Sequence, residues 1–371
     1  MTALPSGYSL AVRVGAGAFG EVFRAREDAA MRWVALKRLS RPDLCKVEAS
    51  ALAAGLPCLP ALYSVFSAKG AEWICMEYVH GLPLGALLAA GVEATEAASV
   101  AGSLVRGLAA LHESGSAHGD LKPENILVQP DGGIRLLDLG LSAAGTDRAM
   151  GGSAGYSAPE AGSPGIDPRR SDLWSLGVVL HEILTGARPA PAERANGWAR
   201  LRAAAPGWVH SVDRLLAEDP ARRPSSIAVL LPELPSAVWT EVAADRLSAA
   251  ADRRLAALLG REAEDLVRRG RSREALPLLQ EALDLDPDQN LSLGLLPRLR
   301  LDEGRSRRRV WVAVVVAAVA AIAVVGALAL REAPEEAYVP LKTGPELERM
   351  PPPRRGSGNP AMPLRERSDR P

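Results

Sequence analysis

The sequence predicts an α+β protein in which a small β-rich lobe is followed by a larger helical lobe, a helical segment and one transmembrane helix. Three observations support this fold class. Apolar residues alternate in short runs over the first eighty positions, helical periodicity dominates from position 95 onward, and one long stretch near the C-terminus carries no charge. A β-rich lobe beside a helical lobe leaves a cleft between them, and ligands usually bind in such clefts.

The strands are expected in four short runs of the opening segment. These runs are residues 10–14, 22–23, 33–36 and 73–76. Alternation with a period of two places every second side chain on one face, which is typical of antiparallel sheets with one buried face. We therefore expect a small antiparallel sheet in this segment.

The composition of the 371-residue chain is that of a folded protein without a nucleic-acid partner. Hydrophobic residues make up 47% of the chain, which is too many for wholesale disorder. The 44 basic and 44 acidic residues cancel, so no net positive field draws the chain to DNA or RNA. Cys45, Cys58 and Cys75 form no disulfide or metal-ligand pattern and are expected to be small buried residues in a reducing compartment.

Residues 310–330 are expected to span a membrane as a single helix. The 21 residues VWVAVVVAAVAAIAVVGALAL carry no charge, and at about 1.5 Å per residue they cover the roughly 30 Å hydrocarbon core of a bilayer. A buried helix of a large soluble core is the alternative, although such helices are rarely apolar on every face. Arginines crowd the juxtamembrane residues 301–309, which predicts a single-pass protein of the cytoplasmic (inner) membrane with residues 1–309 in the cytosol.

The segments on either side of this span differ in composition. Residues 331–371 combine proline, glycine and mixed charge with almost no aromatic residues, which predicts a disordered extracytoplasmic tail. Residues 240–300 are rich in Ala, Leu and Arg and have helical periodicity. One tetratricopeptide-like helix pair is indicated there by the spacing of Gly270, Ala275, Leu279, Ala282 and Pro287. Because such repeats usually bury a core only in about three copies, a plain helical linker is an equal alternative.

A glycine-rich loop lies between two of the expected strands. Gly15, Gly17 and Gly20 carry no side chains that would keep backbone N–H groups away from phosphate oxygens. A dinucleotide-binding loop would lead from a strand into a helix. The strand pattern on both sides of this loop therefore favours a phosphate-binding β-hairpin.

Lys37 ends an apolar strand in a chain that has only five lysines among its 44 basic residues. A surface lysine is the ordinary alternative. A compact ammonium group can sit between the α- and β-phosphates of a nucleotide, which would explain lysine rather than arginine here. Glu48 follows eleven residues later in a helix-like stretch, residues 46–54, and is expected to pair with Lys37 and hold it in place.

The segment HGDLKPEN at residues 118–125 and the sequence Asp-Leu-Gly at 138–140 carry a set of polar residues suited to phosphoryl transfer. That reaction needs a carboxylate to orient an attacking hydroxyl and accept its proton, a cation near the transferred group, and oxygen ligands for Mg²⁺. Asp120, Lys122, Asn125 and Asp138 supply this set. The alternative is that four polar residues occur in these loops by chance. The fixed spacing between them argues against this alternative.

Together these motifs resemble a eukaryotic-type (Hanks-type) protein kinase domain over residues 8–230, in particular that of the bacterial membrane-anchored serine/threonine protein kinase family. The resemblance covers about 60% of the chain and implies a bilobal kinase-like fold. Four further motifs occur in the family's order: MEYV at 76–79, GSAGYSAPE at 152–160, SDLWSLG at 171–177 and DPARRP at 219–224. Lys122, followed by Pro123 and Glu124, is similar to the serine/threonine class rather than the tyrosine class.

The resemblance implies the chemical roles of four residues, with ATP and Mg²⁺ as cofactors and Mn²⁺ as an alternative ion. Asp120 would be the catalytic base, and Lys122 would stabilise the γ-phosphate. Asn125 and Asp138 would bind the metal ion.

The resemblance also implies an ATP-binding set and two structural ion pairs. The pairs are Lys37 with Glu48 and Glu160 with Arg223. The residues implied in ATP binding are Val14, Gly15, Ala16, Gly17, Phe19, Gly20, Val22, Ala35, Lys37, Glu77, Val79 and Leu127.

The function implied is membrane-anchored signalling by transfer of the γ-phosphate of ATP to Ser or Thr hydroxyls of protein substrates. Two departures from the family pattern bear on it. Gly119 stands where many relatives have an arginine that binds a phosphate of the activation loop, and the interval from Lys37 to Glu48 is several residues short. The alternative function is a nucleotide-binding pseudokinase scaffold that recruits partners at the membrane. The sequence leaves homodimerisation open.

Overall fold

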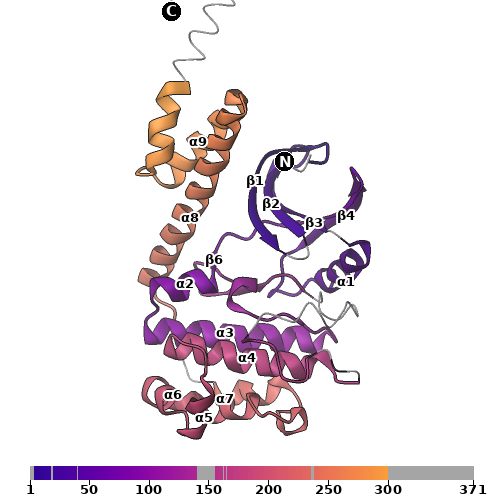
Figure 1. The fold of residues 1–371 in the computed structure, drawn as a ribbon, viewed down its shortest axis with the longest axis vertical. Coiled ribbons are helices and arrows are strands. Elements are labelled where there is room, and N and C mark those ends of the chain that lie inside the picture. Colours follow the sequence, from indigo (N-terminus) through magenta and orange to yellow (C-terminus); the bar gives the residue numbers. More distant parts are fainter. Residues whose placement is uncertain are drawn as a thin grey trace, which may run out of the picture. The chain divides into compact units, whose positions relative to one another are not determined.

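The computed structural model describes residues 4–17, 20–39, 41–139, 155–161, 163, 165–234 and 238–299 of the chain (Figure 1). These residues belong to one compact unit, Met1–Arg305. Among them, no helix is long and apolar enough to cross a membrane. Several predictions lie outside the described residues. They are the juxtamembrane segment 301–309, the transmembrane helix 310–330, the tail 331–371, Phe19, Gly140 and residues 152–154 of the motif at 152–160.

The β-rich lobe, here called the N-lobe, is a five-stranded antiparallel sheet with the strand order β1-β2-β3-β5-β4. Its strands are β1 (Tyr8–Gly17), β2 (Gly20–Glu27), β3 (Arg32–Leu39), β4 (Leu62–Ala68) and β5 (Ala71–Glu77). One helix, α1 (Pro42–Leu52), follows β3. The predicted antiparallel sheet is confirmed, and the four predicted runs fall in β1, β2, β3 and β5.

Strand β4, at the edge of the sheet, has no counterpart among the predicted runs. Its sequence LYSVFSA carries apolar side chains on both faces, so no clean alternation marks it. Tyr63 and Val65 are 38% and 44% exposed. This segment forms a strand because it pairs with β5 through backbone hydrogen bonds, which depends on tertiary structure and not on local pattern.

Strand β3 occupies the centre of the sheet between β2 and β5. Val34 and Leu36 point into a buried cluster on one face of the sheet, with Phe23 and Trp73. Because successive side chains of a strand point to opposite faces, Lys37 lies on the other face. The strand alternation thus directs Lys37 toward the helical lobe.

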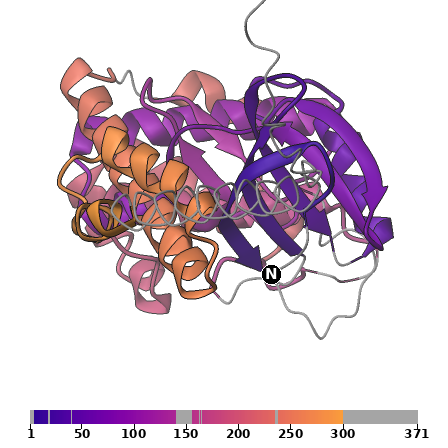
Figure 2. The ribbon, with the colours of Figure 1, turned by 90° about the horizontal axis from the view of Figure 1, so that it is seen from above.

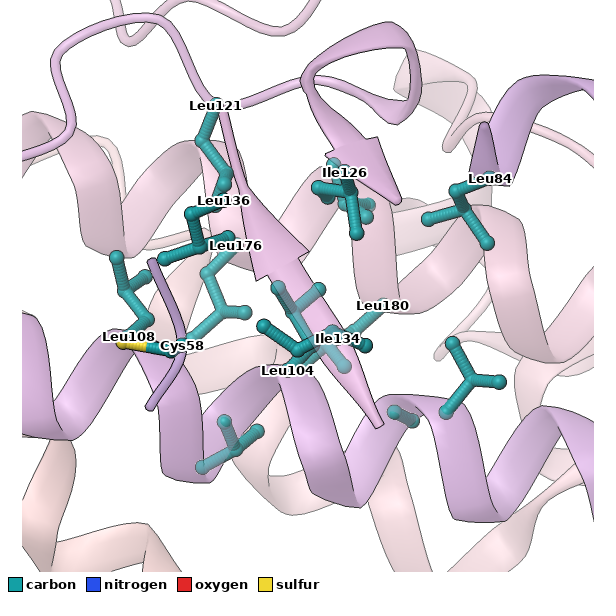
Figure 3. Close-up of a cluster of buried hydrophobic side chains, with 14 of the residues drawn as sticks. Cys58, Leu84, Leu104, Leu108, Leu121, Ile126, Ile134, Leu136, Leu176 and Leu180 are labelled. Carbon is teal, nitrogen blue, oxygen red and sulfur yellow. The ribbon is translucent and has the colours of Figure 1, made fainter. Parts of the chain in front are cut away.

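The helical lobe, here called the C-lobe, is built around α3 (Ala94–Glu113) and α4 (Pro168–Thr185), which pack side by side (Figure 1). Leu104 and Leu108 of α3 and Leu176 and Leu180 of α4 are buried in one apolar cluster (Figure 3). The other elements are β6 (Leu82–Pro83), α2 (Leu84–Ala90), β7 (Ile126–Val128), β8 (Ile134–Leu136), α5 (Pro191–Ala195), α6 (Ala199–Ala204) and α7 (Val209–Leu215). Short 3₁₀ helices occupy Pro123–Asn125, Pro206–Trp208, Pro220–Arg222 and Ile227–Glu233.

Helix α4 begins and ends at residues whose chemistry suits those positions. The Asp167 side chain accepts a hydrogen bond from the Arg169 backbone N–H at 3.0 Å and caps the first turn, and Pro168 occupies the first helical position. Gly186 ends the helix with a φ of +74°, a conformation that glycine adopts without steric cost. These residues account for where α4 begins and ends.

A helical hairpin follows the C-lobe and occupies most of residues 238–299. It consists of α8 (Glu241–Arg268), α9 (Ser272–Leu285) and a further helical stretch over residues 290–299. Gly270, with a φ of +75°, lies in the turn between α8 and α9. Ala275, Leu279 and Ala282 are buried, and their small or apolar side chains lie in the cluster that α9 shares with α8.

Candidate active site

A cleft with a cavity volume of about 90 Å³ opens between the two lobes. Its walls are largely apolar, which suits the flat base of a nucleotide. Six residues implied in ATP binding line it: Val14, Val22, Ala35, Glu77, Val79 and Leu127. Seven further lining residues had no predicted role: Leu52, Pro60, Met76, Tyr78, Leu136, Leu137 and Leu139. Met76 and Tyr78 belong to the motif at 76–79 and Leu139 to the motif at 138–140, whereas the others are apolar residues that carry no local signal of a site.

The glycine-rich loop is the tip of the β1–β2 hairpin, as the strand patterns on both sides predicted. Gly17 and Gly20 pair across its end. A Cβ atom on Gly20 would lie 1.9 Å from the Arg38 carbonyl oxygen of β3. Gly20 is therefore required by close packing of the sheet, in addition to any approach of its backbone N–H group to a phosphate.

Lys37 and Glu48 form the predicted ion pair despite the short interval between them. The Lys37 Nζ atom donates to Glu48 Oε1 at 2.7 Å and to Oε2 at 2.5 Å. It also donates to Asp138 Oδ1 at 2.7 Å. The Lys37 and Glu48 side chains are only 3% and 2% exposed. Helix α1 thus places the Glu48 carboxylate beside Lys37 of β3. The hydrogen bond from Lys37 to Asp138 links the N-lobe to the C-lobe side of the cleft.

The charge of Lys37 is held by its two carboxylate partners. Burial lowers the pKa of Lys37, but Glu48 and Asp138 outweigh this effect, so the pKa is raised above its ordinary value and the ammonium group stays charged. Burial raises the pKa of Glu48, while Lys37 opposes the rise. A permanent positive charge is therefore fixed where the phosphates of a nucleotide in the cleft would lie.

The loop after α3 brings the other predicted residues together. The Lys122 Nζ atom donates to Asp120 Oδ2 at 2.6 Å. The Asn125 side-chain amide donates to the Asp120 carbonyl oxygen at 2.8 Å and to Asp120 Oδ2 at 3.1 Å. Because the 3₁₀ turn Pro123–Asn125 folds the chain back, Lys122 and Asn125 both contact the carboxylate of Asp120. Such a carboxylate is fixed in orientation before a substrate arrives.

Asp138 occupies the left-handed backbone region with a φ of +59°. Residues other than glycine adopt this conformation rarely, although Asp does so more readily than most, and strained residues of this kind cluster at functional sites. The neighbouring Leu137 backbone N–H donates to the Asn125 carbonyl oxygen at 2.9 Å, which ties the two segments together. The backbone turn directs the Asp138 carboxylate toward Lys37.

Asn125 and Asp138 suit a magnesium ion that a nucleotide also helps to bind. Mg²⁺ is commonly held by one or two protein oxygen ligands together with phosphate oxygens and waters. The amide nitrogen of Asn125 is engaged with Asp120, so its amide oxygen is the atom that a metal would take. In the part of the chain that the structure describes, three or more His, Cys, Asp or Glu side chains do not gather into a metal-binding group.

Helix α4 supports this loop through Asp172, which had no predicted role of its own. The Asp172 carboxylate accepts from the backbone N–H of His118 at 2.7 Å and of Gly119 at 2.8 Å. It also contacts the His112 Nε2 atom at 2.9 Å. Asp172 is 1% exposed, so these bonds form in a dry environment where they are strong. The motif at 171–177 was the sequence signal for this support.

His118 acts as a structural residue within the loop. Its Nδ1 atom accepts a hydrogen bond from the Asp120 backbone N–H at 3.3 Å. Burial lowers the pKa of His118, so the imidazole is neutral at physiological pH. Its position favours backbone organisation rather than proton transfer.

The second predicted ion pair, Glu160 with Arg223, also forms. The Arg223 Nη1 and Nη2 atoms donate to the two Glu160 oxygens at 2.5 and 2.9 Å. Arg223 also donates to the carbonyl oxygens of Arg170 and Ala217 at 2.8 and 2.9 Å. With its side chain fully buried, Arg223 fastens the segment before α4 to the base of the C-lobe.

A sheet-rich lobe over a helical lobe, with a lysine–glutamate pair on one side of the cleft and an aspartate–asparagine loop on the other, is the architecture of a protein kinase. The protein kinase domain family model matches residues 8–296, and the chain belongs to this family. The match includes most of the helical hairpin that follows the C-lobe. Members of this family are phosphotransferases, and every core residue of the site is retained here.

Curated relatives include bacterial and plant kinases. The chain is 29% identical over 261 residues to serine/threonine-protein kinase PknE of Mycobacterium bovis. The aligned region covers 64% of this chain and 46% of PknE. It is 28% identical over 268 residues to serine/threonine-protein kinase PrkC of Bacillus subtilis, covering 65% and 41%. It is 30% identical over 268 residues to CBL-interacting protein kinase 25 of Oryza sativa, covering 62% and 51%. The chain spans about half the length of the curated relatives it matches.

Proposed function

We propose that the chain is an ATP-dependent serine/threonine protein kinase that transfers the γ-phosphate of ATP to protein hydroxyls. The observation that carries this proposal is a chain of contacts at the cleft. Lys37 pairs with Asp138, which lines the cleft. Asn125, whose carbonyl oxygen accepts from the neighbouring Leu137, holds the Asp120 carboxylate. The named serine/threonine kinases among the relatives support the same activity. The Lys122-Pro-Glu sequence supports hydroxyls of Ser or Thr rather than Tyr.

The residues of the site divide the chemical work. Asp120 orients the attacking hydroxyl and accepts its proton, and Lys122 and Asn125 hold its carboxylate for that purpose. Lys37 supplies the fixed positive charge for the α- and β-phosphates. Asn125 and Asp138 would hold Mg²⁺, which neutralises phosphate charge when it is bound.

The proposal includes attachment to the cytoplasmic membrane through residues 310–330, with the kinase domain in the cytosol. Its support is the uncharged stretch of 21 residues and the arginines that precede it. The full chain should remain with the membrane fraction after alkaline carbonate extraction. Release into the soluble fraction would exclude an integral anchor.

The kinase proposal is tested with the full chain, Mg²⁺, labelled ATP and a generic protein substrate. Asp120→Asn should lower the rate of phosphoryl transfer by about 10²–10⁴-fold because it removes the proton acceptor. Binding of a non-hydrolysable ATP analogue should stay within about twofold of wild type, because the variant keeps the shape of the site. Asp131→Asn is the matched control, since Asp131 lies in the exposed β7–β8 turn.

Two results would contradict the proposal. Phosphoryl transfer that survives Asp120→Asn would remove Asp120 from the reaction. Nucleotide binding without any transfer in the wild-type chain would favour the pseudokinase scaffold, in which the cleft binds ATP and the protein only recruits partners.

A further inference from the structure

Helix α8 contacts three parts of the kinase domain in succession along its length. Near its start, Leu247 is buried in the core of the C-lobe. About one and a half turns further, Asp252 lies 3.5 Å from the Nε2 atom of His80, in the segment that links the two lobes. Further along, Leu259 is buried in a cluster that includes Val12 of β1. One continuous helix therefore follows the junction of the two lobes from the C-lobe to the N-lobe.

The C-lobe end of the hairpin is fastened at two places. The Trp239 Nε1 atom donates to the Pro130 carbonyl oxygen at 2.7 Å. The Trp239 ring also lies so close to Gly132 that a Cβ atom there would be 2.7 Å from it. Arg246 forms an ion pair with Glu96 of α3, whose side chain is 7% exposed. These contacts hold the first turns of α8 against the C-lobe.

The N-lobe end is fastened by a buried arginine. Arg24 of β2 forms an ion pair with Glu281 of α9, and the Arg24 side chain is 5% exposed. Its Cζ atom lies 3.4 Å from the centroid of the Trp33 ring and 5.2 Å from that of Tyr78. The Arg24 Nε and Nη1 atoms have no hydrogen-bond partner among the described residues. Glu281 is therefore the carboxylate on which this buried charge depends.

This arrangement couples the hairpin to the nucleotide cleft. Tyr78, which contacts Arg24, is also a lining residue of the cleft. The N-lobe supplies Val14 and Val22 to the same cleft from the β1–β2 hairpin, beside which α8 and α9 lie (Figure 2). Helix α8 has 28 residues and is about 42 Å long, so it can act as a stiff element that touches both lobes.

We propose that the hairpin of residues 238–299 is an interlobe brace that fixes the N-lobe over the C-lobe in the nucleotide-binding orientation. Arg24 and Glu281 are its positioning residues at the N-lobe end, and Leu247 is its anchor at the C-lobe end. The brace acts through Tyr78 and the β1–β2 hairpin, and none of its residues touches the reacting atoms. It rests on the proposed use of the cleft for ATP.

A double-mutant cycle tests the brace because a stiff link fails when either end is released. Glu281→Gln releases the N-lobe end and Leu247→Ala releases the C-lobe end. Leu247 lies in the C-lobe core and Glu281 pairs with Arg24 of the N-lobe, so the two sites share no partner and independent effects would multiply. Where Leu247→Ala does not fold, Arg246→Gln releases the same end more gently.

Two readouts are taken on the full chain. The first is the dissociation constant of a non-hydrolysable ATP analogue. The second is amide hydrogen exchange in the β1–β2 hairpin and in residues 77–83, which needs no nucleotide. Matched controls are Glu274→Gln, which breaks an ion pair with Arg271 inside the hairpin, and Leu293→Ala, whose side chain is 47% exposed.

Each single variant should weaken analogue binding by about five- to tenfold and speed exchange in both segments, whereas the controls should change neither. The double variant should bind no more than about tenfold more weakly than wild type, because the brace is already released. Loss of about 25-fold or more in the double variant, or unchanged exchange in the single variants, would overturn the brace. If the wild-type chain binds no analogue, the proposed function fails, and hydrogen exchange alone still decides the brace.

Discussion

Lys37 shows how one buried charge can be kept inside a folded protein. Its side chain is 3% exposed, and an unpaired ammonium group there would be strongly unfavourable. Glu48 and Asp138 compensate the charge from two different elements. The ammonium group is thereby fixed in place and charged before any ligand binds, which is what electrostatic preorganisation requires. Its three hydrogen bonds go to Glu48 and Asp138, so a phosphate oxygen would replace one of them.

We expect Lys37→Met to lower phosphoryl transfer by about 10²–10³-fold, because it removes a preorganised positive group from the cleft. Steady-state kinetics against ATP concentration measure the effect. Arg38→Met is the matched control on the same strand, since Arg38 lies 3.6 Å from Glu21 and its side chain is 40% exposed. Equal losses in the two variants would show that β3 is only destabilised and that Lys37 has no special role.

The pair of Glu160 and Arg223 predicts a pH-dependent contribution to stability. Burial alone would raise the pKa of Glu160, but the hydrogen bonds from Arg223 outweigh it and hold the pKa below its usual 4.5. A lowered pKa in the folded state gives stability that is present above about pH 4.5 and is lost as the pH falls through the folded pKa.

Glu160→Gln should therefore lower the free energy of unfolding at neutral pH by about 3–5 kcal/mol, because the fully buried Arg223 loses its charge partner. Below pH 4.5 the difference from wild type should shrink, since protonated Glu160 resembles glutamine. Urea unfolding at several pH values measures this trend. A difference that stays constant down to pH 3 would refute the linkage.

At the scale of elements, two aspartates of the α4 segment have different roles. Asp167 caps the first turn and so stabilises the helix itself. Asp172, one and a half turns later, accepts two backbone hydrogen bonds from the catalytic loop. The helix thus determines the shape of a loop that is fifty residues earlier in the chain.

Asp172→Asn should lower kcat by about 10–100-fold and leave KM for ATP within about twofold. The reason is that an amide can replace only part of the acceptor capacity for His118 and Gly119, so Asp120 loses its fixed position. Asp167→Ala, on the same helix, should cost about 1 kcal/mol of stability and leave kcat unchanged. Steady-state kinetics and thermal melts separate the two effects, and a raised KM with normal kcat in Asp172→Asn would contradict this role.

At the scale of the whole molecule, the helical hairpin shares an apolar core with the N-lobe. Val12 of β1 belongs to the same buried cluster as Leu255 and Leu259 of α8 and Leu279 of α9. A separate helical linker would expose these side chains to water. The shared core therefore predicts that the hairpin and the N-lobe unfold together.

Leu259→Ala should lower the free energy of unfolding by about 2–5 kcal/mol, because it leaves a cavity in this shared core. Leu293→Ala, at an exposed position, should change it by less than about 0.5 kcal/mol. Circular dichroism reports the helices, and tryptophan fluorescence includes the N-lobe through Trp33 and Trp73. The two signals should shift together in Leu259→Ala, and a shift of the helical signal alone would show that the hairpin folds independently.

The sequence predicted most of the site because its chemistry uses polar residues at fixed local spacing. Asp120, Lys122 and Asn125 lie within six positions, so one 3₁₀ turn is enough to bring them together. Lys37 stood out because lysine is rare in this chain. By contrast, Pro60 and Leu136 line the cleft without any polar signal, and β4 has no clear alternation. Such residues acquire their roles only from what packs beside them.

The sequence by itself predicted the lobe order, the candidate site residues and the class of reaction, since periodicity and side-chain chemistry are local properties of the chain. Only the tertiary structure decided that Gly20 must clear the β3 backbone, that Asp172 holds the catalytic loop, and that Arg24 depends on Glu281. Arg24 and Glu281 are 257 positions apart. Contacts between residues so far apart in sequence depend on how helices and sheets pack, and they cannot be inferred from the hydrophobic pattern or the composition of the chain.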